Sequence, residues 1–243
     1  MNLAIDIGNT LSKMAVFSDG DITETYRYTD LSQKVIESIF NKYPGISKTI
    51  LSSVKNVDPK LIDFIKLKSD LFIELNEQTK IPIDNLYHSK STLGKDRLAS
   101  AIGANNIFPN TNVLVIDMGT AITIDFVNNK NQYLGGNISP GLETRFKALH
   151  QFTGKLPLLQ KKEQFDFLAK NTEDAIISGV QNGIIYELDG YINDLKYNHN
   201  DLKVILTGGD AIFFDKKLKN TIFVNSNLNF IGLNIILETN TAQ

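Results

Sequence analysis

Two acidic residues that each precede a glycine by two positions are the residues of this sequence best suited to bind phosphate. Asp6 and Gly8 end one apolar run, and Asp117 and Gly119 end another. A glycine lets backbone N–H groups approach an anion with no side chain in the way. An aspartate at the end of a buried strand can hold Mg²⁺ through water, because this ion keeps several of its waters. Each turn therefore predicts a phosphate-binding loop; the alternative is an ordinary hairpin in which the aspartate caps its own turn.

The first of these turns carries further phosphate-binding groups. Asn9 and Thr10 supply side-chain donors, and Lys13 supplies a positive charge. We therefore expect the whole segment to surround the phosphates, namely Asp6, Ile7, Gly8, Asn9, Thr10, Leu11, Ser12 and Lys13.

The second turn repeats the first. Leu3 to Thr10 aligns with Leu114 to Ala121, and an alternating strand follows each segment. This repeat suggests duplicated halves that face a shared cleft. Two carboxylates and a polyphosphate in one cleft would repel by several kcal/mol at an effective dielectric of ~20. The pattern therefore predicts bound cations, Mg²⁺ with a monovalent ion, and Thr120 adds a hydroxyl at the second turn.

A third glycine-rich turn follows a short apolar run near the C-terminus. Gly208 and Gly209 come directly after Thr207. Paired glycines allow a flat ligand such as adenine and its ribose to lie against the backbone. A tight strand-to-helix connection explains the same residues equally well.

A candidate general base lies at the start of an alanine-rich helix. Asp96 stands between Lys95 and Arg97 and follows Gly94. The two basic neighbours and the positive end of the helix favour its ionised form, which can accept a hydroxyl proton. Arg97 can bind a carbonyl or carboxylate of the same substrate. The alternative is a helix cap, which typically contributes about 1 kcal/mol.

Strands alternate with helices along the chain, which indicates an α/β fold. We expect strands at 3–7, 13–17, 22–28, 49–54, 71–75, 113–116, 122–127 and 204–206, and helices at 31–40, 59–67, 94–108, 142–152, 172–195 and 230–237. The length of 243 residues fits two domains of roughly 100 to 130 residues. We place the boundary so that residues 1–111 and 112–243 form the two domains.

Composition excludes several classes of function. There is no cysteine, and 25 basic and 27 acidic residues are scattered along the chain for a net charge of −2. Nucleic-acid binders concentrate Lys and Arg in a stripe, so we expect no nucleic-acid partner. No apolar run approaches the ~20 residues of a membrane span and no secretory signal begins the sequence, so we expect no membrane contact and a cytoplasmic location.

Taken together, these motifs resemble the type III pantothenate kinases, members of the actin-like and sugar-kinase-like superfamily. The resemblance covers essentially the whole chain. Motif by motif, the matching positions are Asp6 to Lys13, Tyr87 before Gly94 to Arg97, Asp117 to Thr123, Gly135 to Gly141, Asn171-Thr172 and Thr207 to Gly209. It implies two duplicated actin-like ATPase (ribonuclease H-like) domains with a nucleotide cleft between them.

The resemblance also implies an activity and a role for each motif. The reaction would be ATP-dependent phosphorylation of the primary hydroxyl of pantothenate, the first step toward coenzyme A. Asp96 would be the general base, and pantothenate would be held by Tyr87, Gly94, Lys95, Asp96, Arg97 and Thr172. ATP would be held by Asp6 to Lys13, Thr120, Gly208 and Gly209, with Mg²⁺ at Asp6 through water and K⁺ or NH₄⁺ at Asp117. Members of the family are typically homodimers.

Three other functions are compatible with parts of this pattern. A related kinase for a sugar or small acid would keep both phosphate turns but would not need the Tyr87 to Arg97 arrangement. A regulatory protein that binds nucleotide without turnover would have no use for Asp96 as a base. An actin-like filament protein is disfavoured by the short length of the chain.

Overall fold

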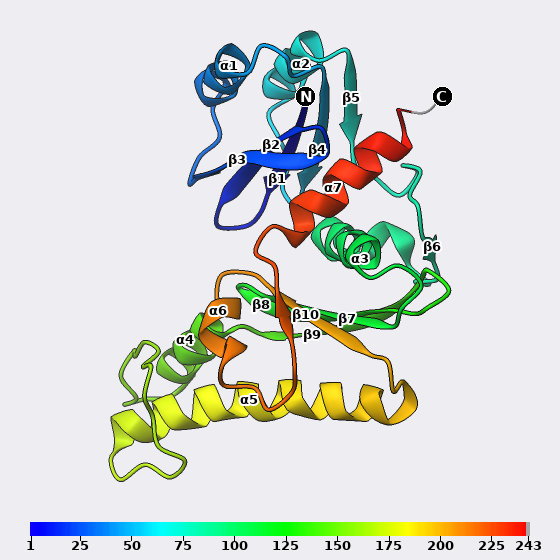
Figure 1. Ribbon diagram of the computed structural model, residues 1–243. Helices are drawn as coiled ribbons and strands as arrows, with labels where there is room; N and C mark the ends of the chain where they lie inside the picture. The colour runs from blue at the N-terminus through cyan, green and yellow to red at the C-terminus, as the bar shows by residue number, and fades with distance from the viewer. Residues whose placement is uncertain (242–243) are drawn as a thin grey trace. The chain divides into compact units, whose positions relative to one another are not determined.

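The computed structural model describes residues 1–241 and has a mixed α/β fold (Figure 1). The chain forms two compact units. Residues Met1–Ile107 and the segment from Asn227 onward make the first unit, and Phe108–Ser226 makes the second. Each unit contains five strands of one sheet, and each is described separately below.

The sheet of the first unit has the strand order β3-β2-β1-β4-β5. These strands are β1 (Asn2–Ile7), β2 (Ser12–Ser18), β3 (Asp21–Tyr28), β4 (Lys48–Ser53) and β5 (Leu71–Glu74). β1 is antiparallel to β2 and parallel to β4, so a hairpin joins it to one neighbour and a crossover connection leads to the other.

The helices of the first unit lie on both faces of this sheet. α1 (Gln33–Lys42) and α2 (Pro59–Lys68) share one hydrophobic cluster with Leu3, Ile5 and Ile7 of β1. Side chains alternate along a strand, so Asn2, Ala4 and Asp6 point to the opposite face. That face is packed by α7 (Leu228–Thr239), which in turn packs on α3 (Lys95–Ile107), as Figure 1 shows.

The strands of the second unit follow the same order, β9-β8-β7-β10-β11. They are β7 (Val113–Met118), β8 (Ala121–Val127), β9 (Gln132–Pro140), β10 (Lys203–Thr207) and β11 (Phe223–Val224). β7 is antiparallel to β8 and parallel to β10, as β1 is to β2 and β4. The sequence repeat therefore corresponds to a structural duplication, and the predicted fold class is confirmed.

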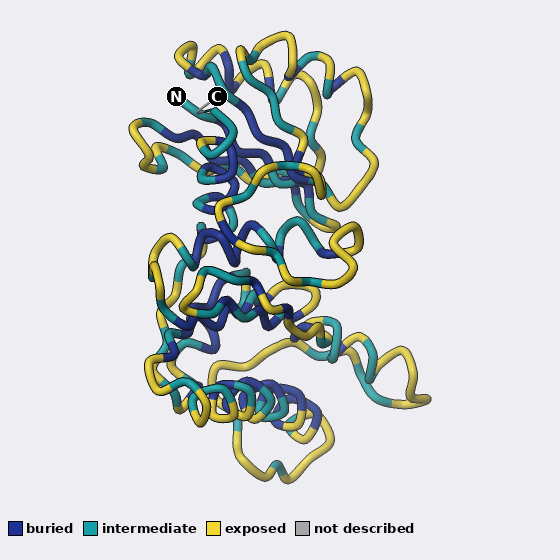
Figure 2. The backbone as a smooth tube through the Cα atoms, turned by 90° about the vertical axis from the view of Figure 1, so that its right-hand side faces the viewer, coloured by how far each residue is buried: buried dark blue, intermediate teal, exposed yellow. Residues whose placement is uncertain are grey.

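One face of the second sheet is covered by α4 (Leu142–Phe152), α5 (Thr172–Asn198) and α6 (Ala211–Asp215), which share a core with Leu114, Ile116 and Met118. α5 begins at the N-cap Asn171, whose side chain accepts a hydrogen bond from Asp174 N. Its buried residues form one face along its length, visible as the dark side of the helix in Figure 2. Asp117 points to the face of the sheet opposite to these helices.

The long connection between β5 and α3 contains little regular structure. It holds the two-residue strand β6 (Asp84–Asn85) and the 3₁₀ turn η1 (Lys90–Thr92). The sequence did not predict β6, β9, α6 or β11, which are short or contain glycine. No helix within residues 1–241 is long and apolar enough to cross a membrane.

The compact units change over at residue 107/108 and again at 226/227. The division into domains 1–111 and 112–243 stays a prediction. It differs from the compact units mainly in α7, which packs on α3, β1 and β4 of the first unit although it ends the chain.

Candidate active site

The first Asp-x-Gly turn is the hairpin between β1 and β2. Gly8 N donates to Leu11 O at 3.1 Å and closes the turn. A Cβ on Gly8 would lie 3.1 Å from that same oxygen, so the glycine relieves crowding. In the sheet, Asp6 pairs with Lys13 on one side and with Ser52 on the other.

The carboxylate of Asp6 lies within electrostatic reach of Asp96. Burial raises the pKa of Asp6 to about 6, and the negative charge of Asp96 raises it as well, whereas Lys13 and Ser52 lower it. A neighbouring like charge disfavours ionisation in this way when it lies within a few ångströms. The two acids that the sequence placed in separate motifs therefore occupy one site in the first unit.

Asp96 is the second residue of α3, so it lies inside the helix and is not its N-cap. Its Oδ1 accepts a hydrogen bond from Arg97 N at 2.9 Å. A Cβ on Gly94 would lie 2.6 Å from Asp96 Oδ1, so the absence of a side chain there lets the carboxylate lie against the backbone of Gly94. The glycine therefore permits this orientation of the Asp96 carboxylate in the first turn of α3.

Tyr87 and Arg97 are in contact. The Arg97 guanidinium carbon lies 5.8 Å from the centroid of the Tyr87 ring, a cation–π arrangement. Arg97 is buried, with 6% of its surface exposed. Tyr87 is held in turn by Asn85, whose Oδ1 accepts from Tyr87 N at 3.0 Å. Arg97 is therefore nearly enclosed by the protein, with the Tyr87 ring against its guanidinium.

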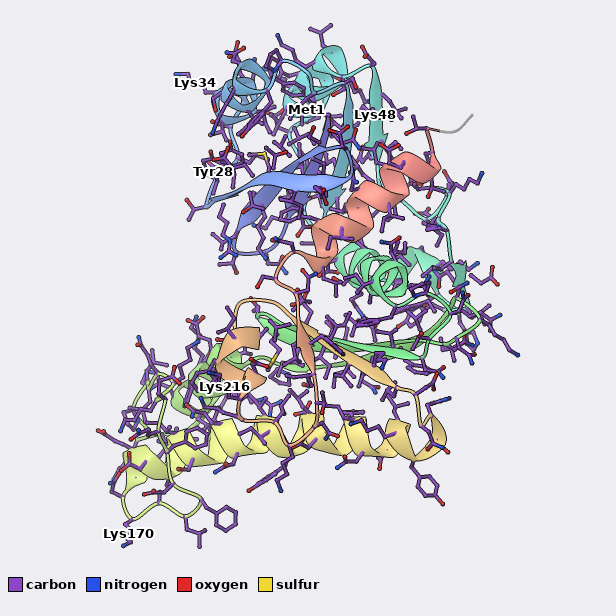
Figure 3. The ribbon with its side chains drawn as sticks, viewed as in Figure 1. Met1, Tyr28, Lys34, Lys48, Lys170 and Lys216 are labelled. Atoms are coloured by element: carbon purple, nitrogen blue, oxygen red, sulfur yellow. The ribbon has the colours of Figure 1, made fainter. Side chains whose placement is uncertain are left out.

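α7 fixes the position of α3. A Cβ on Gly232 would overlap the Ala99 carbonyl, and one on Gly103 would overlap the Leu228 carbonyl, so the two helices touch backbone to backbone. At the start of α7, Asn229 Nδ2 donates to the Asp96 carbonyl at 3.3 Å. Near its end, α7 is tied to β4, where Lys48 Nζ pairs with Glu238 at 3.2 Å. Figure 3 labels Lys48 of this pair.

Lys95 faces away from Asp96. Together with Leu98 it lines a cavity of about 390 Å³ in the first unit, whose other walls come from residues 75–93. Residues 95 and 98 lie close together on a helical wheel, whereas 96 lies on a different face. The motif Gly94 to Arg97 therefore presents side chains to two different surroundings.

The second Asp-x-Gly turn is the hairpin between β7 and β8. Gly119 N donates to Ala121 O at 3.1 Å, so this turn is one residue shorter than the first. Asp117 pairs with Thr123 where Asp6 pairs with Lys13. The residue across the hairpin from the aspartate is therefore a lysine in the first half and a threonine in the second.

The glycine turn after β10 lies against this second hairpin. Gly208 has φ +90°, and a Cβ there would lie 2.5 Å from Asp117 Oδ1. Asp210 N donates to Met118 O at 3.1 Å. The structure therefore brings Asp117 together with Gly208 and Gly209, as a nucleotide site built from both motifs requires.

The glycine-rich segment of β9 ends at Gly141, the N-cap of α4, which contacts the second Asp-x-Gly turn. Gly141 N donates to Thr120 O at 3.0 Å, and a Cβ on Gly141 would overlap the Gly119 carbonyl. Thr144 Oγ1 also donates to Thr120 O, at 2.7 Å. The last glycine of this motif is therefore needed to seat α4 against the second turn.

A second cavity, of about 350 Å³, lies beside the glycine turn of the second unit. Leu142, Phe146 and Leu159 supply apolar surface, and Lys161 and Asp210 form an ion pair at 2.6 Å on its wall. The sequence analysis named none of these residues, because they come from separate segments and carry no local motif.

The remaining predicted residues are distributed as follows. Thr172 is exposed at the first position of α5 in the second unit, whereas the other five proposed pantothenate residues are in the first unit. Within residues 1–241, His, Asp and Glu form no cluster of three or more that could hold a metal ion. Metal binding by Asp6 or Asp117 would thus need further ligands from the nucleotide or from water.

Sequence comparison identifies relatives along the entire chain. The family model described as type III pantothenate kinase matches residues 2–194. A type III pantothenate kinase of Bacteroides fragilis is 43% identical over 243 residues, covering 100% of both chains. One of Christiangramia forsetii is 44% identical over 245 residues, again covering 100% of both.

Solved structures share the fold. A putative Baf family transcriptional activator from Campylobacter jejuni aligns with a TM-score of 0.64 at 24% identity, covering 99% of this chain and 100% of that one. A putative 2-dehydro-3-deoxygalactonokinase from Sinorhizobium meliloti aligns at 0.61 and 10% identity, covering 100% of both chains. These likenesses support the actin-like ATPase and sugar-kinase fold, and the sequence relatives carry the family. The chain belongs to the type III pantothenate kinases.

Proposed function

We propose that this chain phosphorylates the primary hydroxyl of pantothenate with ATP, and that Asp96 is the general base. The reaction follows from membership of the family: this enzyme is a pantothenate kinase, which acts at the first step of coenzyme A synthesis. The observation that supports the residue assignment is the proximity of Asp96 to Asp6, the acid of the phosphate turn.

In the proposed mechanism Asp96 accepts the proton of the pantothenate hydroxyl. The hydroxyl oxygen forms a bond to the γ-phosphorus, the bond to the leaving ADP breaks, and the proton moves to the Asp96 carboxylate. Gly94 lets the carboxylate adopt its orientation, and the start of α3 favours the negative charge of the base. Tyr87 and Arg97, which contact each other, bind the rest of the substrate.

Asp6 fits a site for the divalent cation that accompanies ATP. Burial and the negative charge of Asp96 disfavour its ionised form, and a bound cation would offset both effects. Mg²⁺ favours such a site, because it takes one or two carboxylates, retained waters and substrate phosphates. Bound with ATP, it neutralises charge on the phosphates. Residues Asp6 to Lys13 bind those phosphates through the backbone of the turn and through Lys13.

The second unit contributes the other nucleotide groups in this proposal. Asp117 holds a monovalent cation, K⁺ or NH₄⁺, and Thr120 contacts a phosphate. The cavity beside Gly208 and Gly209 receives the adenosine, with apolar contacts from Leu142 and Phe146. Thr172 contacts pantothenate from the start of α5.

We further propose that the enzyme is a cytoplasmic homodimer, as expected from the resemblance. Light scattering of the purified protein should give twice the mass of one 27.1 kDa chain. A mass equal to one chain at micromolar concentration would contradict the dimer.

Coupled ADP release tests the function directly. Purified protein with Mg²⁺, K⁺ and ATP should release ADP when pantothenate is added, and not with a panel of sugars or with no acceptor. Turnover with a sugar but not with pantothenate would favour a related small-molecule kinase. Nucleotide binding without any turnover would favour a regulatory protein.

A further inference from the structure

A buried hydroxyl beside Asp6 has no role in the site described so far. Ser52 on β4 lies opposite Asp6 in the sheet and is 1% exposed. Leu51 belongs to the core under α1 and α2, so Ser52 points to the other face, together with Asp6.

This hydroxyl lacks a full hydrogen bond. Among residues 1–241, Ser52 Oγ has no partner that meets hydrogen-bond distance and angle. It nevertheless lies beside Asp6, because the two residues pair directly in the sheet and their side chains share one face. A buried hydroxyl left without a partner is unfavourable. Ser52 is therefore a buried donor next to the Asp6 carboxylate, with no other partner among the described residues.

The second half of the duplication repeats this arrangement. Thr207 on β10 lies opposite Asp117 and is 3% exposed. The antiparallel partners of the two aspartates differ, Lys13 in one half and Thr123 in the other. The parallel partner bears a hydroxyl in both halves. The shared feature is thus a buried hydroxyl beside each aspartate of a phosphate turn.

We propose that Ser52 is a positioning residue for Asp6, and that its hydroxyl donates to the ionised carboxylate and fixes the orientation in which Asp6 accepts a Mg²⁺-bound water. The proposal rests on the function proposed above, in which Asp6 serves the cation that accompanies ATP. A carboxylate has about four acceptor positions, so a bond to Ser52 leaves others for water. Partners that orient a metal-binding group typically change metal affinity by about 10- to 100-fold when removed.

The test is a titration of the full-length protein with Mn²⁺ in the presence of a non-hydrolysable ATP analogue, with free Mn²⁺ followed by its EPR signal. Ser52→Ala should weaken Mn²⁺ binding by about 10-fold, and Ser52→Thr, which restores the hydroxyl, should bind within about 2-fold of the unchanged protein. In turnover, Ser52→Ala should raise the Mg²⁺ concentration for half-maximal rate by a similar factor, with a smaller change in the KM for pantothenate. Ser52→Cys keeps the volume with a weak donor and replaces the alanine variant if that variant does not fold.

Thr49 supplies a matched control on the same strand. It is 0% exposed, points to the α2 face and bonds Ser69 Oγ at 2.7 Å. Thr49→Val should lower the melting temperature and leave Mn²⁺ binding unchanged. Unchanged Mn²⁺ affinity in folded Ser52→Ala, or equal losses in Ser52→Ala and Thr49→Val, would overturn the proposal. Because the titration involves no acceptor alcohol, a failure of pantothenate to react would overturn the proposed function and not this result.

Discussion

At the scale of single residues, the site depends on two carboxylates in one unit that differ in their surroundings. Asp6 is at the end of a buried strand, between Lys13 and Ser52. Asp96 is in the first turn of a helix, with its carboxylate against Gly94. Environments that separate the behaviour of two acids commonly assign them different tasks. The acid in the phosphate turn suits a cation, and the acid at the start of the helix suits the acceptance of a proton.

Replacing the proposed base should remove chemistry and keep the fold. We expect Asp96→Asn to lower kcat by ~10²- to 10⁴-fold, the range for loss of a general base, with little change in melting temperature. Steady-state ADP release and circular dichroism would measure both. A kcat near that of the unchanged protein would mean that Asp96 serves only the helix start.

Asp6 should make the stability of the protein depend on pH in an unusual direction. Its pKa of about 6 in the folded chain exceeds its ordinary value of 3.8, so the folded state binds more protons between these values. Its contribution to stability is therefore complete below pH ~4 and is lost as the pH rises through 6. Asp6→Asn should remove this loss and raise the free energy of unfolding at pH 7.5 by about 1–3 kcal/mol, because one pKa unit corresponds to about 1.4 kcal/mol.

Urea unfolding at pH 4.5 and 7.5 measures this difference. The exposed Asp63→Asn on α2 is the control and should change neither value. An Asp6→Asn variant that is no more stable than the unchanged protein at pH 7.5 would contradict the assigned cause, the burial of a charge.

Asp117 allows a separate test of the monovalent site. Its carboxylate touches the turn at Gly208, and removing its charge should weaken a bound K⁺. In Asp117→Asn, the activation of ADP release by K⁺ over Na⁺ should shrink or vanish. Activation by K⁺ of unchanged size would refute Asp117 as a ligand, whatever the effect on kcat.

At the scale of elements, local patterns predicted most of what holds the site. Apolar runs ending in Asp-x-Gly predicted β1, β2, β7 and β8 and their turns, because hairpin chemistry is local. The neighbours across the sheet, Ser52 and Thr207, could not be identified, since parallel pairing joins segments that no local pattern connects. The crowding at Gly141 and Gly232 was likewise invisible, because it arises from backbones distant in the sequence.

The contact between α3 and α7 should be sensitive to one methyl group. A Cβ on Gly232 would overlap the Ala99 carbonyl, three residues beyond Asp96. We expect Gly232→Ala to separate the helices, to cost about 1–3 kcal/mol or more, and to lower kcat by moving the first turn of α3. Thermal unfolding and ADP release would measure the two effects.

Gly190 on α5 is the control for this substitution. Nothing lies within 4 Å of a Cβ placed there. Gly190→Ala should therefore be neutral or stabilise by up to about 1 kcal/mol, the helix propensity difference. A Gly232→Ala variant that behaves like Gly190→Ala would show that the contact between α3 and α7 can accommodate a methyl group.

At the scale of the whole molecule, the duplicated sheets were foreseeable and the return of the chain to the first unit was not. The aligned turns predicted two halves, and the strand orders around β1 and β7 are the same. The apolar pattern of residues 230–237 predicted a helix but not its location, because periodicity identifies a buried face and not the surface that it meets. α7 in fact packs against β1, β4 and α3.

Because α7 belongs to the first unit, the first unit should fail to fold without it. Five apolar side chains of α7 are 5% exposed or less, namely Leu228, Phe230, Leu233, Ile236 and Leu237. At about 1.5–3 kcal/mol each, their burial stabilises by roughly 7–15 kcal/mol, as much as the whole stability of an ordinary domain.

A chain ending at Ser226 should lose activity and one of the calorimetric unfolding transitions, and limited proteolysis should leave a resistant fragment close to Phe108–Ser226. Leu233→Ala should cost about 2–5 kcal/mol without abolishing the transition, whereas Leu67→Ala, at a site 83% exposed, should have no such effect. If the truncated chain instead protects residues 1–107 from protease, the first unit folds without α7, and the core of that unit must be sufficient on its own.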